Sequence, residues 1–367
     1  MAAVIRNRRD FLKLGAGLAA SAALPGAAQA QSTPLKTLGA SRGLVVGSAC
    51  DSREIANSDY RALVARESAV ITGTWEFQMK TVEPIQGTFV WPNELVSYCT
   101  TNSMKLHGHA LQWHTLTPSW LNNIQPGTPG KSAQLQYIMN LVSHYRGRMY
   151  AWDVVNEPIF TEDGRADGLR NSIWLRIVGS DYILRAFKLA RQADANAILV
   201  LNEYGLYYEH SYHEIRRQAL LRLLESLVRQ GAPINALGLQ SHLSPNSRWG
   251  RLDVVRFGQF LNDVEALGLK LMITEFDVSD AYLPADVVTR DRMVADAARE
   301  YLDLVLSHRS CISLQTWGSS DKYSWLNWAA PRTDGLQVRP LPFDANMVQK
   351  PLWSAIASSI SNAPARW

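Results

Sequence analysis

The sequence predicts an α/β fold, a single-domain (β/α)8 TIM barrel. Three observations favour it: after residue 40, short apolar runs suited to buried parallel strands recur eight times, helix-length amphipathic segments separate them, and no linker or composition break interrupts the rhythm. A chain of 367 residues leaves room for one such barrel with long loops. A doubly wound open sheet is the alternative, but it would not need eight units, and no glycine-rich phosphate loop follows the first run.

The eight predicted strands start apolar and end polar. They are LVVGSA from Leu44, VIT from Val70, LHGHAL from Leu106, YAWDVVNE from Tyr150, ILVLNE from Ile198, LGLQSH from Leu237, LMITEF from Leu271 and ISLQTW from Ile312. From the third run onward, the polar or aromatic ends are His109, Asn156, Glu157, Asn202, Glu203, Gln240, His242, Glu275, Asp277 and Trp317. Structural polar residues would be scattered over both ends of the strands. Their concentration at the carboxyl ends, where barrel enzymes place their catalytic groups, predicts one site there.

Three segments between the runs have the apolar spacing of amphipathic helices. They are WLRIVGSDYILRAFKLARQA from Trp174, HEIRRQALLRLLESLVRQG from His213 with Gly231 as the C-cap, and RMVADAAREYLDLVLSHR from Arg292.

Residues 1–30 predict a twin-arginine export signal. The motif NRRDFLK contains Arg8 and Arg9, a weakly apolar segment follows, and the AQA sequence at 28–30 offers a cleavage site. The apolar segment is too short and glycine-rich for a membrane span. We therefore expect a periplasmic or secreted bacterial protein whose catalytic domain occupies residues 31–367.

The charge and cysteine content exclude several classes of function. The formal charge is +4, but the first thirty residues hold four basic residues and one acidic residue, so about +1 remains, which gives no electrostatic case for nucleic-acid binding. The cysteines are Cys50, Cys99 and Cys311, which form no CxxC or Cys/His cluster, so we expect buried free thiols. We expect neither a metal nor a cofactor.

The chemistry that remains is that of two carboxyl groups in a tryptophan-rich pocket, as in a glycosidase. An apolar run precedes Glu157, so desolvation there should raise its pKa and suit a proton donor. Glu275 and Asp277 point to the same side of a strand, and His242 on the neighbouring strand could bridge them, which would keep Glu275 ionised. Flat apolar faces for sugar rings could come from Trp113, Trp317 and Trp325.

These residues resemble glycoside hydrolase family ten, the retaining endo-β-1,4-xylanases built on a (β/α)8 barrel. The resemblance covers essentially the whole chain after the signal. The segments that match, in order, are HGHALQWH (107–114), WDVVNEP (152–158), GLQSHL (238–243), ITEFDV (273–278), WGSSDKYSWL (317–326) and PLPFDANMVQKP (340–351).

The resemblance implies roles for individual residues. Glu157 would be the acid/base and Glu275 the nucleophile, about 5–5.5 Å apart, as retention requires. Asn156 would hold the 2-hydroxyl of the sugar at the cleavage point. The other residues expected in the supporting and binding shell are His109, Trp113, His114, Glu203, Tyr204, Gln240, His242, Asp277, Trp317 and Trp325.

Two segments depart from the family pattern. The family usually has Glu-Asn-x-x-Lys-Trp after the second strand, where it grips the non-reducing-side sugars. Here an ungapped alignment places Thr74, Trp75 and Gln78 at the Glu, Asn and Lys positions, whereas a slipped alignment would recover Glu76 and Lys80. In the fifth strand, LNEYG (201–205) replaces Asn-Asp-Tyr-Asn. Trp75 could stack on a sugar or block that position.

The predicted function is therefore a retaining endo-β-1,4-glycanase, with xylan as the default substrate. The runner-up is the same mechanism on another β-linked glycan, such as a decorated or bacterial exopolysaccharide. A non-catalytic sugar-binding barrel is a third possibility, but such a protein would be expected to lack one of the two glutamates. We expect a monomer whose partner is a polysaccharide or oligosaccharide.

Overall fold

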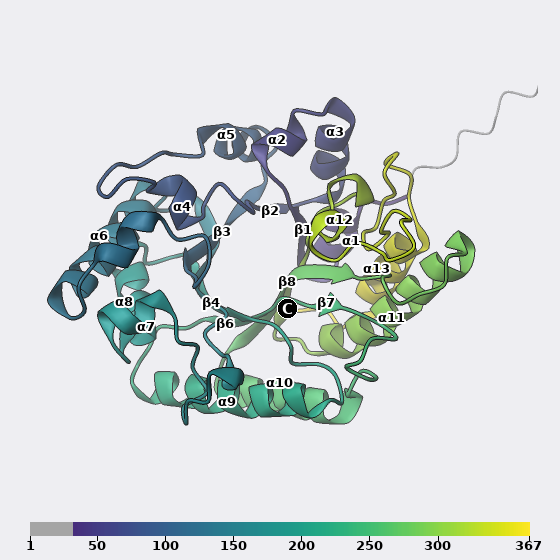
Figure 1. Cartoon of the computed structure of the whole chain (residues 1–367). Helices are drawn as coiled ribbons and strands as arrows, with labels where there is room; N and C mark the ends of the chain where they lie inside the picture. Colours follow the sequence, from purple (N-terminus) through teal and green to yellow (C-terminus); the bar gives the residue numbers. More distant parts are fainter. Residues whose placement is uncertain (1–31) are drawn as a thin grey trace, which may run out of the picture. The chain divides into compact units, whose positions relative to one another are not determined.

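The computed structural model describes residues 32–367, so the predicted signal at residues 1–30 lies outside the described part. Residues 34–367 form one compact unit. Its centre is a ring of parallel strands surrounded by helices, seen along the ring axis in Figure 1. Among residues 32–367, no helix is both long and apolar enough to cross a bilayer.

Eight strands close the barrel, as the sequence predicts. The strands are β1 (Val45–Ala49), β2 (Val70–Thr72), β3 (Lys105–Gln112), β4 (Met149–Asn156), β5 (Ile198–Glu203), β6 (Ala236–Leu239), β8 (Lys270–Val278) and β9 (Cys311–Thr316). Each pairs in parallel with its neighbours, and the pairings of β6 with β8 and of β1 with β9 complete the ring. The open-sheet alternative is therefore excluded. A ninth strand, β7 (His242–Leu243), pairs only with the end of β8.

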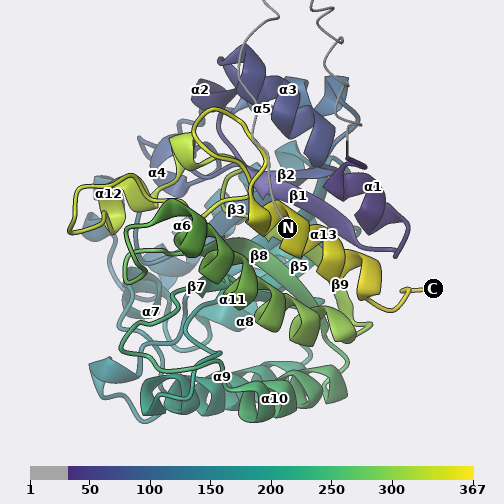
Figure 2. The same cartoon turned by 90° about the vertical axis from the view of Figure 1, so that its right-hand side faces the viewer.

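Helices follow most of the strands and cover the outside of the ring. They are α1 (Leu35–Ala40), α2 (Ser52–Ile55), α3 (Ser58–Glu67), α4 (Met79–Val82), α5 (Asn93–Thr101), α6 (Thr128–His144), α7 (Ile173–Val178), α8 (Tyr182–Ala193), α9 (Ser211–Arg229), α10 (Val254–Ala266), α11 (Val287–Ser307), α12 (Leu326–Ala329) and α13 (Pro351–Asn362). Short 3-10 turns occur at Ser119–Asn123, Thr161–Asp163 and Asp321–Tyr323. Figure 2 shows α11 and α13 side by side on one flank.

The predicted helices from His213 and Arg292 are confirmed as α9 and α11, and Gly231 lies just beyond α9 with a left-handed φ of 71°. The predicted helix from Trp174 is wrong in one respect, because it is broken into α7 and α8. Gly179, with φ 108°, ends α7, and the chain turns before α8 begins. Glycine adopts this backbone conformation without a steric penalty, so the helix can end there. The apolar spacing of the sequence continues on both sides of Gly179 and therefore does not reveal the end of the helix.

The barrel wall is packed tightly enough to require a glycine opposite Trp152. Gly108 on β3 is in register with Trp152 on β4, and a Cβ atom at Gly108 would lie 2.1 Å from the indole ring. Trp152 is fully buried, and it holds β4 in the position from which Asn156 and Glu157 emerge. The three cysteines are buried and unpaired, as expected.

Candidate active site

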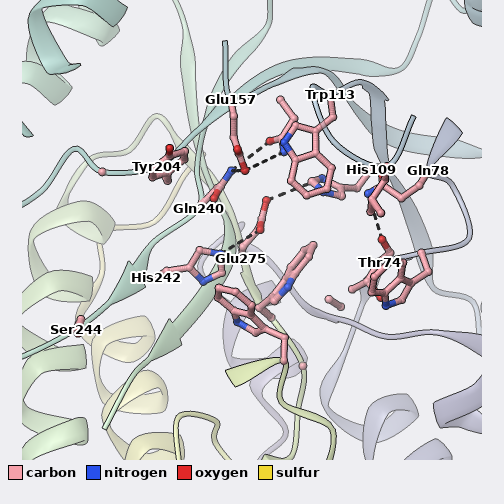
Figure 3. Close-up of a pocket in the computed structure, with 18 of the residues that line it drawn as sticks. Thr74, Gln78, His109, Trp113, Glu157, Tyr204, Gln240, His242, Ser244 and Glu275 are labelled. Carbon is pink, nitrogen blue, oxygen red and sulfur yellow. Dashed lines mark hydrogen bonds and ion pairs between the residues drawn. The ribbon is translucent and has the colours of Figure 1, made fainter. Parts of the chain in front are cut away.

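A cavity of about 580 Å³ opens at the carboxyl ends of the strands (Figure 3). Side chains from β1, β2, β3, β4, β5, β6, β8 and β9, or from the loops that follow them, line it. The predicted site residues in its lining are Trp75, Gln78, His109, Trp113, Asn156, Glu157, Tyr204, Gln240, His242, Glu275, Trp317 and Trp325. Within residues 32–367, no group of three or more His, Cys, Asp or Glu side chains is arranged to hold a metal ion.

Glu157 is the first residue after β4 and turns the chain into the cavity. Its backbone has a left-handed φ of 55°, which is strained for a residue with a side chain and is typical of functional positions. The Glu157 amide donates to the Asn202 carbonyl at 2.9 Å, which fixes the turn. Burial raises the pKa of Glu157, although contacts from Trp113 and Gln240 oppose the shift. This carboxyl therefore favours the protonated form more than an exposed glutamate does.

Glu275 lies across the cavity on β8, and its side chain is only 6% exposed. His242 Nε2 lies 3.2 Å from Glu275 Oε2, while His242 Nδ1 lies 3.0 Å from Asp277 Oδ1. Burial alone would lower the pKa of His242, but Asp277 and Glu275 overcome that effect and raise it to about 10. His242 is therefore an imidazolium at neutral pH, and its positive charge lies against the Glu275 and Asp277 carboxyl groups.

An amide network connects the two glutamates. Asn202 Nδ2 donates to Glu275 Oε1 at 2.7 Å and to Asn156 Oδ1 at 2.9 Å. Gln240 Nε2 donates to Glu157 Oε1 at 3.2 Å and also to Asn156 at 3.2 Å. The network holds both carboxyl groups in fixed orientations before any substrate enters.

Asp153 anchors the histidine side of the cavity. The buried Asp153 carboxylate contacts His107 Nε2 at 3.0 Å and His109 Nδ1 at 2.8 Å, so Asp153 is a satisfied polar group within the barrel wall. Burial opposes ionisation, but the two histidines outweigh it and hold the pKa of Asp153 at about 2. The carboxylate raises the pKa of His109 against burial and fixes the orientation of its ring.

The aromatic side chains expected to face a sugar gather around the glutamates. Trp317 lies 5.3 Å from the His109 ring, and Trp325 lies 5.1 Å from the His242 ring. The Trp325 indole also donates to Asp277 at 2.7 Å, which positions both residues. Trp317 and Trp325 thus supply apolar surface on the side of the cavity where His109 and His242 lie.

His114 lies beside Glu157 and is not part of the cavity lining. Its Nδ1 is 3.7 Å from Glu157 Oε2, and its side chain is 24% exposed. Burial and the nearby Arg170 lower the pKa of His114 to about 4, so the ring is neutral at neutral pH. Direct contact between His114 and a sugar in this cavity is therefore not supported by the geometry.

The divergent segment after β2 forms one end of the cavity. Thr74, Trp75 and Gln78 all line it, whereas Glu76 and Lys80 do not, which favours the ungapped alignment. Asp51 holds this end, because its Oδ1 accepts from the Thr74 and Trp75 amides at 3.1 and 3.2 Å, and its other oxygen accepts from the Thr74 hydroxyl. The Trp75 side chain is 40% exposed.

The prediction that Glu203 binds substrate is wrong. Glu203 has no exposed surface and makes a 2.5 Å ion pair with the buried Arg216. Its carboxylate also accepts from the Ile159 and Tyr204 amides at 2.9 and 3.0 Å. Glu203 therefore fixes the loops after β4 and β5, while the next residue, Tyr204, does line the cavity.

The sequence analysis placed Asn202 at the rim of the site without giving it a role of its own, and it did not name several other lining residues. Asn202 precedes Glu203 on β5, and strand alternation was the signal that it points to the opposite side, toward Glu275. Other lining residues had no such signal because they lie beyond the strands, on loops, in 3-10 turns or in the helices that follow. They are Glu54, Leu116, Tyr207, Tyr208, Tyr212, His213, Ser244, Trp249, Tyr323 and Trp328.

Comparison with known proteins places this site in a family. The family model "Glycosyl hydrolase family 10" matches residues 34–359, and a twin-arginine translocation signal model matches residues 7–25. The second match supports export.

Curated relatives are 31% identical to this chain over the aligned residues. Endo-1,4-beta-xylanase C of Phanerodontia chrysosporium is 31% identical over 339 residues, covering 90% of this chain and 80% of that protein. Endo-1,4-beta-xylanase C of Paenibacillus barcinonensis is 31% identical over 348 residues, covering 88% of this chain. This chain spans only 31% of the length of that relative.

Solved structures have the same fold. Xylanase 10B from Thermotoga petrophila RKU-1, in complex with xylobiose, superposes with a TM-score of 0.80 at 27% identity, covering 90% of this chain and 98% of the other. The structure of GH10 from Paenibacillus barcinonensis superposes with a TM-score of 0.76 at 30% identity, covering 89% and 96%. With a family model that matches most of its length, the chain belongs to glycosyl hydrolase family 10.

Proposed function

We propose that this glycoside hydrolase is a retaining endo-β-1,4-xylanase, with Glu157 as the acid/base and Glu275 as the nucleophile. The observation that carries the proposal is that both glutamates line one cavity in contrasting environments: burial raises the pKa of Glu157, and Glu275 is held against the His242 imidazolium. Relatives named endo-1,4-beta-xylanase support xylan as the substrate.

The reaction proceeds in two displacements. In the first, Glu275 attacks the anomeric carbon while Glu157 protonates the departing glycosidic oxygen, leaving the sugar bonded to Glu275. In the second, Glu157 removes a proton from water, which attacks the same carbon and releases Glu275. Two inversions give net retention. The Asn156 amide, held by Asn202 and Gln240, is positioned to bind the sugar's 2-hydroxyl.

Hydrolysis of a glycan panel tests this function. The purified protein should release xylobiose and xylotriose from β-1,4-xylan, and proton NMR should show the β-anomer of the product first. Failure to cleave xylan while another β-glycan is cleaved would overturn the substrate, and initial release of the α-anomer would overturn the double displacement.

One observation favours a second candidate, the same mechanism on another β-linked glycan. Thr74, Trp75 and Gln78 line the end of the cavity where the family usually has Glu, Asn and Lys, so charged contacts to sugar hydroxyls are absent from these three positions. Preferential cleavage of a decorated glycan or a bacterial exopolysaccharide in the same panel would support this candidate.

The export signal and the assembly state complete the proposal. We infer cleavage after Ala30, which would leave residues 31–367 as the catalytic domain in the periplasm or outside the cell, and we infer a monomer. Mass spectrometry of the exported protein tests the cleavage position, cell fractionation tests the compartment, and sedimentation equilibrium tests the assembly state.

A further inference from the structure

A chain of hydrogen bonds inside the barrel leads from His109 away from the cavity. His109 lines the cavity beside Glu275, and Asp153 holds its Nδ1, so Nε2 is the nitrogen left for a substrate hydroxyl (Figure 3). The other oxygen of Asp153 contacts His107 Nε2 at 3.0 Å, and His107 Nδ1 lies 2.9 Å from Gln315 Nε2. The chain thus connects the cavity with β9, on which Gln315 lies.

Two hydroxyl groups fix the orientation of the Gln315 amide. The Thr72 hydroxyl donates to Gln315 Oε1 at 2.6 Å, as suits a carbonyl oxygen. On the other side, Gln315 Nε2 lies 3.2 Å from Ser313 Oγ, and the Ser313 hydroxyl donates to the Val45 carbonyl at 3.1 Å. Because a hydroxyl has one hydrogen, Ser313 Oγ can only accept from Gln315, so the amide nitrogen must lie on this side. The same nitrogen faces His107.

This orientation leaves His107 one arrangement of its proton. An amide nitrogen only donates, so His107 Nδ1 must accept and carries no proton. The proton of the neutral imidazole is then on Nε2, which donates to the Asp153 carboxylate. The side chains of the chain are at most 2% exposed, so water cannot readily replace these bonds, and a misplaced proton would leave buried polar atoms unsatisfied.

The position of this proton matters for His109, because Asp153 serves both histidines. A neutral His107 leaves the negative charge of Asp153 to His109, whose Nδ1 lies 2.8 Å from the other carboxylate oxygen. In the opposite tautomer, the bare Nε2 of His107 would face a carboxylate oxygen, and their repulsion would displace Asp153. A second proton would instead make His107 a competing cation. The titrating groups along the chain are Asp153 and His109, with Glu275 beyond them, whereas β2 and β9 contribute uncharged side chains, namely Thr72, Ser313 and Gln315.

We propose that Gln315 is a positioning residue that fixes the proton of His107 on Nε2 and thereby holds the His109 ring in its binding orientation. The effect passes through the Asp153 carboxylate, which both histidines share. Gln315 itself is fully buried and does not line the cavity, so it touches no substrate. The inference rests on the proposed function, because it assigns His109 to the sugar at the cleavage point.

Heteronuclear NMR of protein labelled at its histidine nitrogens tests the proton position directly. Such spectra distinguish the two neutral tautomers from the imidazolium, and a His107→Gln variant identifies the His107 signals. In the wild type, we expect His107 to stay in the neutral Nε2–H form between about pH 5 and 8, the range in which an unrestrained imidazole changes charge. A doubly protonated His107 in the wild type would overturn the proposal.

The variant Gln315→Met keeps the length of the side chain and removes the donor to His107. Nδ1 is then free, so we expect His107 to take up a second proton within the same pH range, next to Asp153. We also expect kcat/KM for xylohexaose to fall roughly 2–10-fold, equivalent to about one hydrogen bond.

A double-variant cycle tests whether Thr72 acts through the same proton. Thr72→Val removes the hydroxyl that orients the Gln315 amide. Because both side chains act on one tautomer, the double variant should lose no more kcat/KM than Gln315→Met alone. Losses that multiply would overturn the shared route.

A matched control is Gln134→Met. Gln134 is also fully buried, and its amide donates to Gln112 Oε1 at 3.2 Å and to the Tyr182 carbonyl at 2.8 Å, without contacting a histidine. This variant should lower the melting temperature, as Gln315→Met does, because both lose buried hydrogen bonds. It should leave the His107 spectrum and kcat/KM as they are in the wild type.

The outcomes separate the two proposals. A wild type that cleaves no xylo-oligosaccharide overturns the proposed function and, with it, the role of Gln315 in the reaction. An active wild type whose Gln315→Met variant keeps the wild-type kcat/KM overturns only the role of Gln315. A lower melting temperature of that variant would then identify the amide as purely structural.

Discussion

His242 Nε2 lies 3.2 Å from Glu275 Oε2, with Asp277 on the other ring nitrogen. The imidazole is therefore a fixed positive charge beside Glu275, the proposed nucleophile, and a second carboxylate orients it. This arrangement resembles the way that a buried carboxylate orients the histidine in serine hydrolases, although here the histidine does not transfer the reacting proton.

Removing the nucleophile should abolish turnover. Glu275→Gln keeps the size of the side chain and its contact with Asn202, but an amide cannot form the glycosyl ester. We expect kcat on xylan to fall by at least about 10⁴-fold, since covalent catalysis is lost. Steady-state hydrolysis measures it, and activity equal to that of the wild type would refute the assignment of Glu275.

Replacing the acid/base should produce a loss that depends on the leaving group. Glu157→Ala should lower kcat on xylan about 10²–10⁴-fold, because general acid catalysis is lost. An aryl xylobioside with an acidic phenol needs little protonation, so its glycosyl-enzyme still forms, and added azide should accelerate turnover and yield the β-glycosyl azide. Formation of the α-azide, or no response to azide, would contradict the role of Glu157.

The pKa of His242 makes stability depend on pH. The folded-state pKa is raised from 6.5 to about 10, so this group stabilises the fold fully below about pH 6.5, and the contribution is lost as the pH rises toward 10. His242→Asn should therefore reduce the decline in unfolding free energy between pH 6.5 and 10. Urea unfolding at pH 6, 8 and 10 measures the decline, and equal slopes for the two proteins would refute the raised pKa.

The same charge should affect catalysis. In His242→Asn the proposed nucleophile loses the adjacent cation and one hydrogen-bond partner, so kcat/KM on xylan should fall about 10–100-fold, the loss of one charged hydrogen bond. A wild-type kcat/KM in this variant would indicate that Asn202 alone holds Glu275 in its reactive position.

The exposed Trp75 should contribute to binding by stacking. Trp75→Ala should raise KM for xylohexaose about 2–10-fold with little change in kcat, because an aromatic face contributes about 0.5–1.5 kcal/mol. A lower KM would show that Trp75 blocks the sugar-binding position at this end of the cavity.

Thr74→Glu is not a simple restoration of the family motif, because Asp51 already contacts Thr74 and the two carboxylates would repel each other.

Glu203 should affect stability rather than catalysis. Glu203→Ala leaves the buried Arg216 without its carboxylate, and breaking such a pair costs about 3–5 kcal/mol. Chemical denaturation should show that loss. The matched variant Glu214→Ala removes a carboxylate from the partly exposed pair with Arg217, and should cost much less.

The barrel and the position of its site could be predicted because they depend on periodic features. Buried parallel strands appear as apolar runs, and their carboxyl ends meet at one rim, so Glu157 and Glu275 could be placed together from the sequence. The expectation that Glu203 binds substrate follows from the family pattern at LNEYG and fails because Asn202 and Glu203 are successive residues of a strand, whose side chains point to opposite faces.

The part of the cavity lining that follows β5 and β7 could not be predicted from local patterns. Tyr208 and Trp249 lie on loops 41 positions apart, which become neighbours only because the bridge between Tyr208 and Leu252 joins them. Nor does any local signal distinguish His213, which lines the cavity, from His210, which lies at the surface three residues earlier. Such contacts depend on loop conformations rather than on secondary-structure periodicity.

The unpaired state of Cys50, Cys99 and Cys311 has a consequence for where the molecule can mature. The described residues contain no disulfide bond that would need an oxidant to form, so residues 34–367 can reach their final structure in the reducing cytoplasm. Burial also raises the pKa of all three thiols, which leaves little thiolate for oxidants to attack once the protein has been exported. The structure of the folded enzyme therefore does not depend on whether its surroundings are reducing or oxidising. This property suits a protein exported by the twin-arginine pathway, because that pathway transports proteins that have already folded.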